Sequence, residues 1–175
     1  MLDIAVAYNR YKFLGCEFLT WLWFMIENDQ PRLRRIMPEV ASIVVGNRVK
    51  LENRSQNSLE SITIKGDDAG LEEGLLSLRK GAVVVELNIV ATVGEQEWRT
   101  TFKGESFHLS NLRPPDTGAM ETSEDLDGFL LEKVYLYDKL IHWMDDLFVH
   151  FLKIRLSETW RDEGLLPLVS WIEGK

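Results

Sequence analysis

Hydrophobic residues repeat with a helical period at both ends of the chain and with a strand period in its middle. From Leu2 to Asn28, apolar side chains recur every three or four residues, which predicts an aromatic-rich helix over residues 1–28. The sequence Asn28-Asp29-Gln30-Pro31 is a helix stop signal. Residues 32–39 are then expected to form a basic linker that Pro38 interrupts.

Alternating apolar and polar residues predict a sheet within residues 40–110. The strands are expected over Ser42–Val45, Arg48–Glu52, Ser61–Lys65, Ala82–Val93 and Glu97–Lys103, with a short last strand over Ser106–Leu109. Gly46-Asn47 is a favourable two-residue hairpin turn between the first two strands. A short helix over Leu71–Arg79, closed by Gly81, is predicted before the fourth strand.

The rest of the chain is predicted to be an acidic loop followed by helices. Residues 111–124 combine turn-forming and acidic side chains, and residues 125–175 return to a helical period. One long helix is expected over Asp125–Ser157, followed by a short helix over Glu163–Trp171. The core-facing side of the long helix is predicted to be Val134, Tyr137, Ile141, Met144, Phe148 and Phe151, broadened by Leu140 and Leu147.

These elements predict one α+β domain over residues 1–175. Strands that cluster in the centre, with helices before and after, are typical of an antiparallel sheet that carries its helices on one face. We therefore expect a central antiparallel sheet of about five strands. The amino-terminal helix and the long carboxyl-terminal helix should pack together on one side of it.

Charge and cysteine content narrow the possible partners and the compartment. The net charge of −8 argues against non-specific attraction of the whole chain to nucleic acid or to anionic membranes. Residues 1–56 nevertheless hold eight Lys/Arg against six Asp/Glu, so a local basic surface is possible there. The single cysteine, Cys16, favours a reducing compartment, and the apolar run Phe18–Ile26 is too short to span a bilayer. We expect a cytoplasmic protein without a membrane segment.

No segment has the residue spacing of a catalytic or cofactor-binding motif, so we expect a non-enzymatic protein without a cofactor. His142, Asp146 and His150 share one side of the long helix, but a solvated face explains them better than a metal site. The acidic residues Glu121, Glu124, Asp125 and Asp127 leave a metal-dependent nuclease as the enzymatic alternative.

The aromatic helix contains the most unusual segment of the chain, Phe18 to Phe24. Trp21 and Trp23 point about 200° apart on a helix, so they cannot face the same core. One of them must meet a second surface, either another element of this domain or a partner chain. Trp21, Trp23 and Phe24 are therefore the candidate protein-interaction residues.

Seven basic residues are candidates for contact with a nucleic-acid backbone. Three are in the predicted linker, and four are on strand positions expected to point away from the core if Val49, Leu51, Trp98 and Phe102 point inward. They are Arg32, Arg34, Arg35, Arg48, Lys50, Arg99 and Lys103. Glu52 and Glu97 share the outward direction, which favours a salt-bridged, solvated face over a basic one.

The segment Phe13-Leu14-Gly15-Cys16-Glu17-Phe18-Leu19-Thr20-Trp21-Leu22-Trp23-Phe24 resembles a segment of long bacterial proteins that are themselves similar to the recombination-associated protein RdgC. Further similar features follow in the same order, among them Ile62-Thr63-Ile64-Lys65-Gly66, Glu97-Trp98, Leu109-Ser110 and the segment from Phe151 to Ser157. The resemblance covers nearly all of this chain but only the carboxyl-terminal half of the longer proteins. Cys16 replaces an arginine of the pattern, which removes a phosphate contact or a partner for Glu17.

The resemblance implies an accessory role in DNA recombination or replication. The family name implies a toroidal dimer that binds DNA without sequence preference. The expected partners are accordingly DNA, a second copy of the chain, or a separate chain that supplies the missing amino-terminal half. The alternative function is a protein-interaction, oligomerisation module with no DNA role, which agrees better with the net charge of −8.

Overall fold

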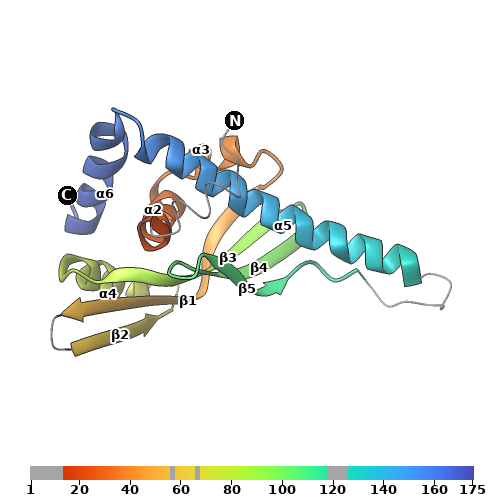
Figure 1. Ribbon diagram of the computed structural model, residues 1–175, viewed down its shortest axis with the longest axis horizontal. Helices are drawn as coiled ribbons and strands as arrows, with labels where there is room; N and C mark the ends of the chain where they lie inside the picture. Colours follow the sequence, from red (N-terminus) through yellow and green to blue (C-terminus); the bar gives the residue numbers. More distant parts are fainter. Residues whose placement is uncertain (1–13, 56–57, 66–67, 118–125) are drawn as a thin grey trace.

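The computed structural model describes residues 14–55, 58–65, 68–117 and 126–175, and it contains one five-stranded antiparallel sheet (Figure 1). The predicted α+β class is confirmed, with the strands in the order β2-β1-β3-β4-β5. The strands are β1 (Ser42–Ser55), β2 (Ser58–Ile64), β3 (Val83–Val93), β4 (Gln96–Lys103) and β5 (His108–Arg113). Each sequential neighbour in the sheet is antiparallel, so β2 and β5 are the two edge strands.

The helices lie on one side of this sheet (Figure 1). They are α2 (Gly15–Asn28), α3 (Gln30–Ile36), α4 (Asp68–Arg79), α5 (Leu126–Arg155) and α6 (Leu166–Glu173), with a π-helical turn over Arg161–Leu165 before α6. The predicted helix over residues 1–28 is confirmed from Gly15 onward, whereas residues 1–13 lie outside the described part. Helix α5 runs across the top of the sheet, and its amino-terminal end reaches beyond the strands (Figure 1).

The hairpin predicted at Gly46-Asn47 is wrong, because β1 continues through these residues as one long strand. The pairing with β3 shifts from Val45↔Ile89 to Val49↔Leu87, so the extra residues bulge out of the ladder. The side chain of Asn88 supports this bulge by accepting a hydrogen bond from the backbone N–H of Asn47 at 3.2 Å. A Cβ on Gly46 would lie 1.9 Å from the Asn88 Oδ1 atom, so a larger residue there would displace the Asn88 side chain that supports the bulge.

The predicted basic linker is also wrong, because residues 30–36 form helix α3. The Asp29 side chain accepts a hydrogen bond from the Arg32 N–H at 3.1 Å, and Pro31 occupies the first turn. Both are signals for the start of a helix. The residues that end α2 therefore also begin the next helix, and the arginines acquire fixed positions on it.

The core is built around Phe18 of α2, which is fully buried. Its ring centroid lies 5.3 Å from those of Phe102 on β4 and Phe148 on α5, and 5.5 Å from that of Phe151. These edge-on and tilted contacts are favourable geometries for aromatic pairs. One side chain thus joins the amino-terminal helix, the sheet and the long carboxyl-terminal helix.

The predicted apolar face of α5 is correct only for the carboxyl-terminal half of that helix. Met144, Phe148 and Phe151 are buried as expected, whereas Val134, Tyr137 and Ile141 are exposed. In the amino-terminal half, the sheet contacts a different side of the helix. That side carries Leu136, Leu140 and Trp143, and the Trp98 indole donates a hydrogen bond to the Leu136 carbonyl at 3.3 Å.

Candidate functional site

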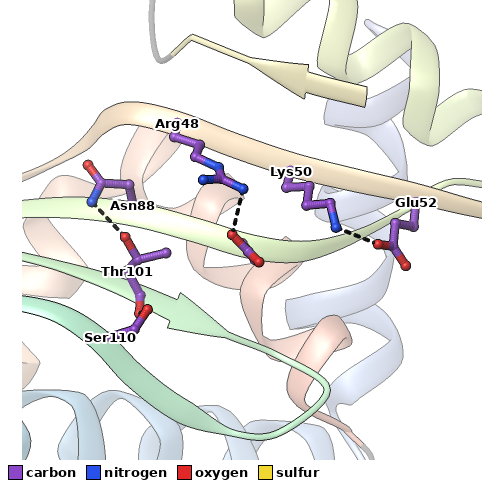
Figure 2. A network of polar contacts seen from close by, with 7 residues as sticks. Arg48, Lys50, Glu52, Asn88, Thr101 and Ser110 are labelled. Carbon is purple, nitrogen blue, oxygen red and sulfur yellow. Dashed lines mark hydrogen bonds and ion pairs between the residues drawn. The ribbon is translucent and has the colours of Figure 1, made fainter. Parts of the chain in front are cut away.

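Arg48 and Lys50, two of the candidate basic residues of the sheet, lie on the face opposite the helices (Figure 2). Val49, Leu51, Trp98 and Phe102 are buried on the helix-covered face, as predicted. Arg48 and Arg99 are consequently exposed on the other face, while Lys50 and Lys103 are half-buried there. The alternation of side chains along each strand therefore predicted the correct side of the sheet for these four residues.

Most of these cations are already paired with carboxylates. The guanidinium of Arg48 lies 3.1 Å from Glu86, and the Lys50 ammonium lies 2.7 Å from Glu52 (Figure 2). Arg99 pairs with Glu97 on its own strand. Within the described residues, Lys103 has no ion pair. The face is salt-bridged, so its positive charge is largely compensated.

A polar network crosses the middle of the same face. The Asn88 amide donates hydrogen bonds of 3.0 Å to the Thr100 carbonyl and to the Thr101 hydroxyl. The Ser110 hydroxyl donates to the Thr101 carbonyl at 3.3 Å, so the network links β3, β4 and β5 (Figure 2). Thr101 is only 4 % exposed. These contacts satisfy polar groups within the sheet, which is a structural role.

The candidate arginines of α3 are divided between two environments. Arg32 and Arg35 line a cavity of about 600 Å³ between α3 and α5, whereas Arg34 is exposed outside it. Asp29 and Ile36 also line the cavity, the α5 side contributes Asp146, Val149, His150 and Lys153, and Glu163 completes the lining. Sequence reasoning missed this cavity because it assigned the arginines to a linker. The capping residue Asp29 was the signal that could have revealed it.

His150 forms part of the wall of this cavity. Its imidazole lies beside the Trp21 indole, with ring centroids 6.2 Å apart. Burial is the main cause that lowers the pKa of His150 below 6.5, followed by the charges of Arg32, Lys153 and Arg35. The ring is therefore neutral at physiological pH, and its buried Nε2 atom has no hydrogen-bond partner in the described part of the chain.

The candidate interaction residues of α2 are turned toward this domain's own elements. Trp21 is 1 % exposed and packs against Phe151 of α5. Trp23 is 2 % exposed and meets Trp171 of α6 edge-on at 5.6 Å, and the half-buried Phe24 meets the same indole at 5.7 Å. The second surface required by the two tryptophans is thus α6. Neither indole is accessible to a partner, so the first of the two alternatives, another element of this domain, holds for both tryptophans.

An exposed apolar surface occurs instead on the amino-terminal half of α5. Its largest exposed fractions are 70 % for Leu131 and 64 % for Val134. The remaining exposed apolar residues of this half are Leu126, Leu130, Tyr135, Tyr137 and Ile141. At its base, Ile141 and Met144 line an apolar groove of about 310 Å³ together with Phe107, Leu109 and Leu112. Sequence reasoning missed this surface because it assigned Val134, Tyr137 and Ile141 to the core and made no assignment for the other four residues.

The candidate metal ligands are not assembled into a site. His142 is exposed and its Nδ1 atom lies 2.8 Å from the Asp138 carbonyl oxygen, whereas His150 is half-buried. Among residues 14–55, 58–65, 68–117 and 126–175, no three His, Cys, Asp or Glu side chains are grouped as metal ligands would be. Glu121, Glu124 and Asp125 of the acidic loop lie outside the described residues. None of the described helices combines the length and apolarity needed to cross a bilayer.

Comparison with known proteins returns no significant match: no family model, no curated protein and no solved structure is similar to this chain.

Proposed function

We propose that this chain is a non-enzymatic, cytoplasmic oligomerisation module that associates through the projecting half of α5. The observation that carries the proposal is the exposed apolar surface of this half-helix. Seven large apolar side chains expose an area on the order of several hundred Å², as large as the biggest apolar patch of a typical monomer. Such an area favours a contact with another protein surface.

The spacing of the exposed residues favours another helix as the partner. Leu130, Val134, Tyr137 and Ile141 follow one another at steps of four, three and four residues. This is the repeat of a coiled-coil seam, in which apolar side chains of two helices interlock. We name these four residues the α5 stripe.

A second copy of this chain is the occupant that we infer for the α5 stripe. Ile141 lies at the base of the projecting half, beside the apolar groove, and Leu130 lies nearer its tip. In an antiparallel pair related by a two-fold axis, Leu130 of each copy lies level with Ile141 of the other. Val134 then lies level with Tyr137, so the same residues serve both sides of the contact.

Strand β5 is a weaker candidate for the contact, although it is an edge strand. It has only six residues, and Asn111 adopts a φ of 53° within it. Its pairing with β4 also shifts between Arg99 and Thr101. Short length and ladder irregularities protect an edge against pairing with another strand. We therefore assign the contact to the helix.

The mass of the protein in solution tests this proposal. Sedimentation equilibrium should give twice the 20.2 kDa chain mass for the unmodified protein at tens of micromolar. Val134→Glu places a charge in the centre of the stripe, and because Val134 is exposed the fold should tolerate it. This variant should sediment as a monomer.

The matched control is Tyr135→Glu on the same helix. Tyr135 is as exposed as Val134, but it lies about 100° away around the helix, off the α5 stripe. This variant should remain a dimer. A monomeric unmodified protein, or a Val134→Glu variant that still sediments as a dimer, would contradict the proposal.

Nucleic-acid binding is the second candidate function, in an accessory role in DNA recombination or replication. The resemblance to RdgC-like proteins supports it, as does the presence of Arg32, Arg34 and Arg35 on one short helix. No ion pair involves these arginines in the portion of the chain that is described.

Fluorescence anisotropy with labelled single- and double-stranded DNA tests the second candidate. Binding should strengthen as salt is lowered, because phosphate contacts release counterions. Charge reversal at Arg34 and Arg35 should weaken it more than reversal at Arg99 and Lys103, since Arg99 is already paired with Glu97. An absence of binding at low salt would remove this function and leave the oligomerisation module.

A further inference from the structure

The cavity between α3 and α5 is lined by cations from two helices and by the carboxylates of Asp29, Asp146 and Glu163. Arg32 and Arg35 come from α3, and Lys153 comes from α5. The volume of about 600 Å³ is large enough for a small organic ligand. The cavity lies away from the α5 stripe, on the carboxyl-terminal half of that helix, so it does not depend on the proposed self-association.

The three cations of the cavity differ from the cations of the sheet in their partners. Arg48, Lys50 and Arg99 each have a carboxylate within ion-pair distance. Arg32, Arg35 and Lys153 have none among the residues that the structure describes. Asp29, Asp146 and Glu163 line the same cavity, but among the described residues none of them is within ion-pair distance of these cations, which keep N–H donors available to a bound anion.

The neutral imidazole of His150 is consistent with an anion site. Half-burial and the three cations together disfavour a fourth positive charge on the ring. An anion placed among Arg32, Arg35 and Lys153 would offset the repulsion and make protonation of His150 easier. The ring is therefore a built-in reporter of occupancy, because its pKa must rise when an anion binds.

We propose that this cavity binds the phosphate group of a hydroxyl-bearing phosphomonoester. Two guanidinium groups and one ammonium group match the double charge and the several acceptor oxygens of a phosphate. The carboxylates of Asp146 and Glu163, which also line the cavity, accept hydrogen bonds from hydroxyl groups beside the phosphate. A sugar phosphate or a nucleotide has both features.

The same phosphate chemistry could be presented by a free phosphomonoester or by a nucleic-acid strand. Arg34 is the residue that distinguishes binding in the cavity from diffuse electrostatic attraction to a nucleic-acid strand. It is on the same helix and carries the same charge as Arg35, but it does not line the cavity. A compact site should require Arg35 and Lys153 and tolerate Arg34→Ala, whereas diffuse attraction should weaken equally on loss of either arginine.

Nuclear magnetic resonance of the histidine side chains in the full chain tests the proposal. The probe is ribose 5-phosphate, with ribose and inorganic phosphate titrated separately. Ribose 5-phosphate should shift the His150 signals and raise the measured pKa of His150. His142, which is exposed near the middle of α5, is the internal reference and should not respond. Ribose alone should have no effect.

The variants decide whether the response comes from the cavity. Arg35→Ala and Lys153→Ala should weaken binding at least about tenfold, while Arg34→Ala should bind as the unmodified protein does. Both Arg35 and Lys153 are exposed, so truncation should leave the fold intact, and thermal unfolding checks this. No response of His150 to ribose 5-phosphate, or equal losses with Arg34→Ala and Arg35→Ala, overturns the site.

An oligonucleotide without terminal phosphates, whose only phosphate groups are those of its backbone, identifies the source of the phosphate. If it shifts His150 with the same dependence on Arg35 and independence from Arg34, the cavity receives a backbone phosphate. If only ribose 5-phosphate does so, the ligand is a small phosphomonoester. Oligonucleotide binding that leaves His150 unchanged contradicts a phosphate site in this cavity and supports the diffuse contact.

Discussion

Glu17 of α2 and Arg155 of α5 form an ion pair across 138 positions of the sequence, with 2.6 Å between Glu17 Oε1 and Arg155 Nε. Both side chains are about one-third exposed. Glu17 lies in the first turn of α2 and Arg155 in the last turn of α5, so the pair joins the amino-terminal and carboxyl-terminal helices.

The first prediction concerns the strength of this ion pair. Removing either member should destabilise the protein, and a double-mutant cycle with Glu17→Gln and Arg155→Ala should give a coupling of about 0.5–1 kcal/mol, measured by urea unfolding. The value stays small because water reaches both groups. Arg155→Ala alone should cost more than Glu17→Gln, since its guanidinium also lies 5.1 Å from the Trp160 ring centroid.

Salt provides the check on that interpretation. The coupling should shrink at 1 M sodium chloride, whereas the additional loss in Arg155→Ala from the Trp160 contact should persist. A coupling of zero at low salt would show that the pair makes no net contribution.

The second prediction concerns Gly15, where α2 touches the turn after β4. A Cβ on Gly15 would lie 2.0 Å from the backbone oxygen of Gly104, which cannot move without disturbing the sheet. Gly15→Ala should therefore lower the free energy of unfolding by about 2–4 kcal/mol. Chemical denaturation followed by circular dichroism measures this loss.

Gly128 in the first turn of α5 is the matched control. A Cβ there meets nothing within 4 Å in the described structure, so Gly128→Ala should stabilise the helix by about 0.5 kcal/mol. If both alanine variants are equally stable, the close approach of α2 to Gly104 does not exist in solution.

The third prediction separates stability from assembly at Trp23. Its indole is buried against α6, and Nε1 donates a hydrogen bond to Glu27 at 3.2 Å. Trp23→Ala should cost about 3–5 kcal/mol, because it leaves a large cavity in the core. Trp23→Phe should cost less and remain folded, and its mass by sedimentation should equal that of the unmodified protein.

The emission of the native tryptophans tests the same arrangement without a mutation. Trp21, Trp23, Trp98 and Trp143 are buried, so the emission maximum should be blue-shifted and quenching by acrylamide should be weak. Strong quenching, or a change of mass in Trp23→Phe, would indicate that the aromatic helix meets a partner after all.

The fourth prediction concerns pH, because two histidines of α5 should act in opposite directions. The pKa of His150 is lowered from 6.5 in the folded state, chiefly by burial. The unfolded chain therefore binds the proton more readily, and His150 should reduce the free energy of unfolding as pH falls below about 6.5. Arg32 and Arg35 of α3 and Lys153 of α5 strengthen this effect, whereas the nearby Asp146 and Glu163 do not cancel it.

His142 should show the reverse dependence. The Asp138 backbone carbonyl is the main cause that raises its pKa, followed by the Asp138 carboxylate. Its contribution is present below 6.5 and is lost as pH rises through the raised folded-state value. Urea unfolding between pH 5.5 and 7.5 should therefore show a flatter pH profile for His150→Gln and a steeper loss at low pH for His142→Gln. Identical profiles for the two variants would refute the assignment.

In the sheet, some local sequence patterns were sufficient to predict the structure and others were not. Alternation placed Val49, Leu51, Trp98 and Phe102 on the core face correctly, because side chains alternate strictly along a strand. The same reasoning failed at Gly46-Asn47, where a turn and a bulge require the same residue types. The Asn88 side chain on β3 supports the bulge, and that contact cannot be inferred from the local sequence.

In the helices, too, the local sequence pattern predicted some features and not others. The period of α5 predicted a long helix correctly, but the direction of its apolar residues did not reveal which of them the sheet would cover. The α5 stripe and the buried residues Phe148 and Phe151 belong to one continuous pattern, but the sheet contacts the side of Leu136, Leu140 and Trp143 in the amino-terminal half and leaves the stripe exposed. Likewise, the charges of Arg32 and Arg35 were evident, but their position opposite Lys153 was not.

The sequence by itself determined the α+β class, the long carboxyl-terminal helix and the side of the sheet on which Val49, Leu51, Trp98 and Phe102 lie. These follow from local periodicity, which depends only on backbone geometry. The tertiary structure decided that Trp23 meets Trp171, that Glu17 meets Arg155 and that the α5 stripe is left uncovered. Those outcomes depend on which distant segments fill the same space, and no local pattern contains that information.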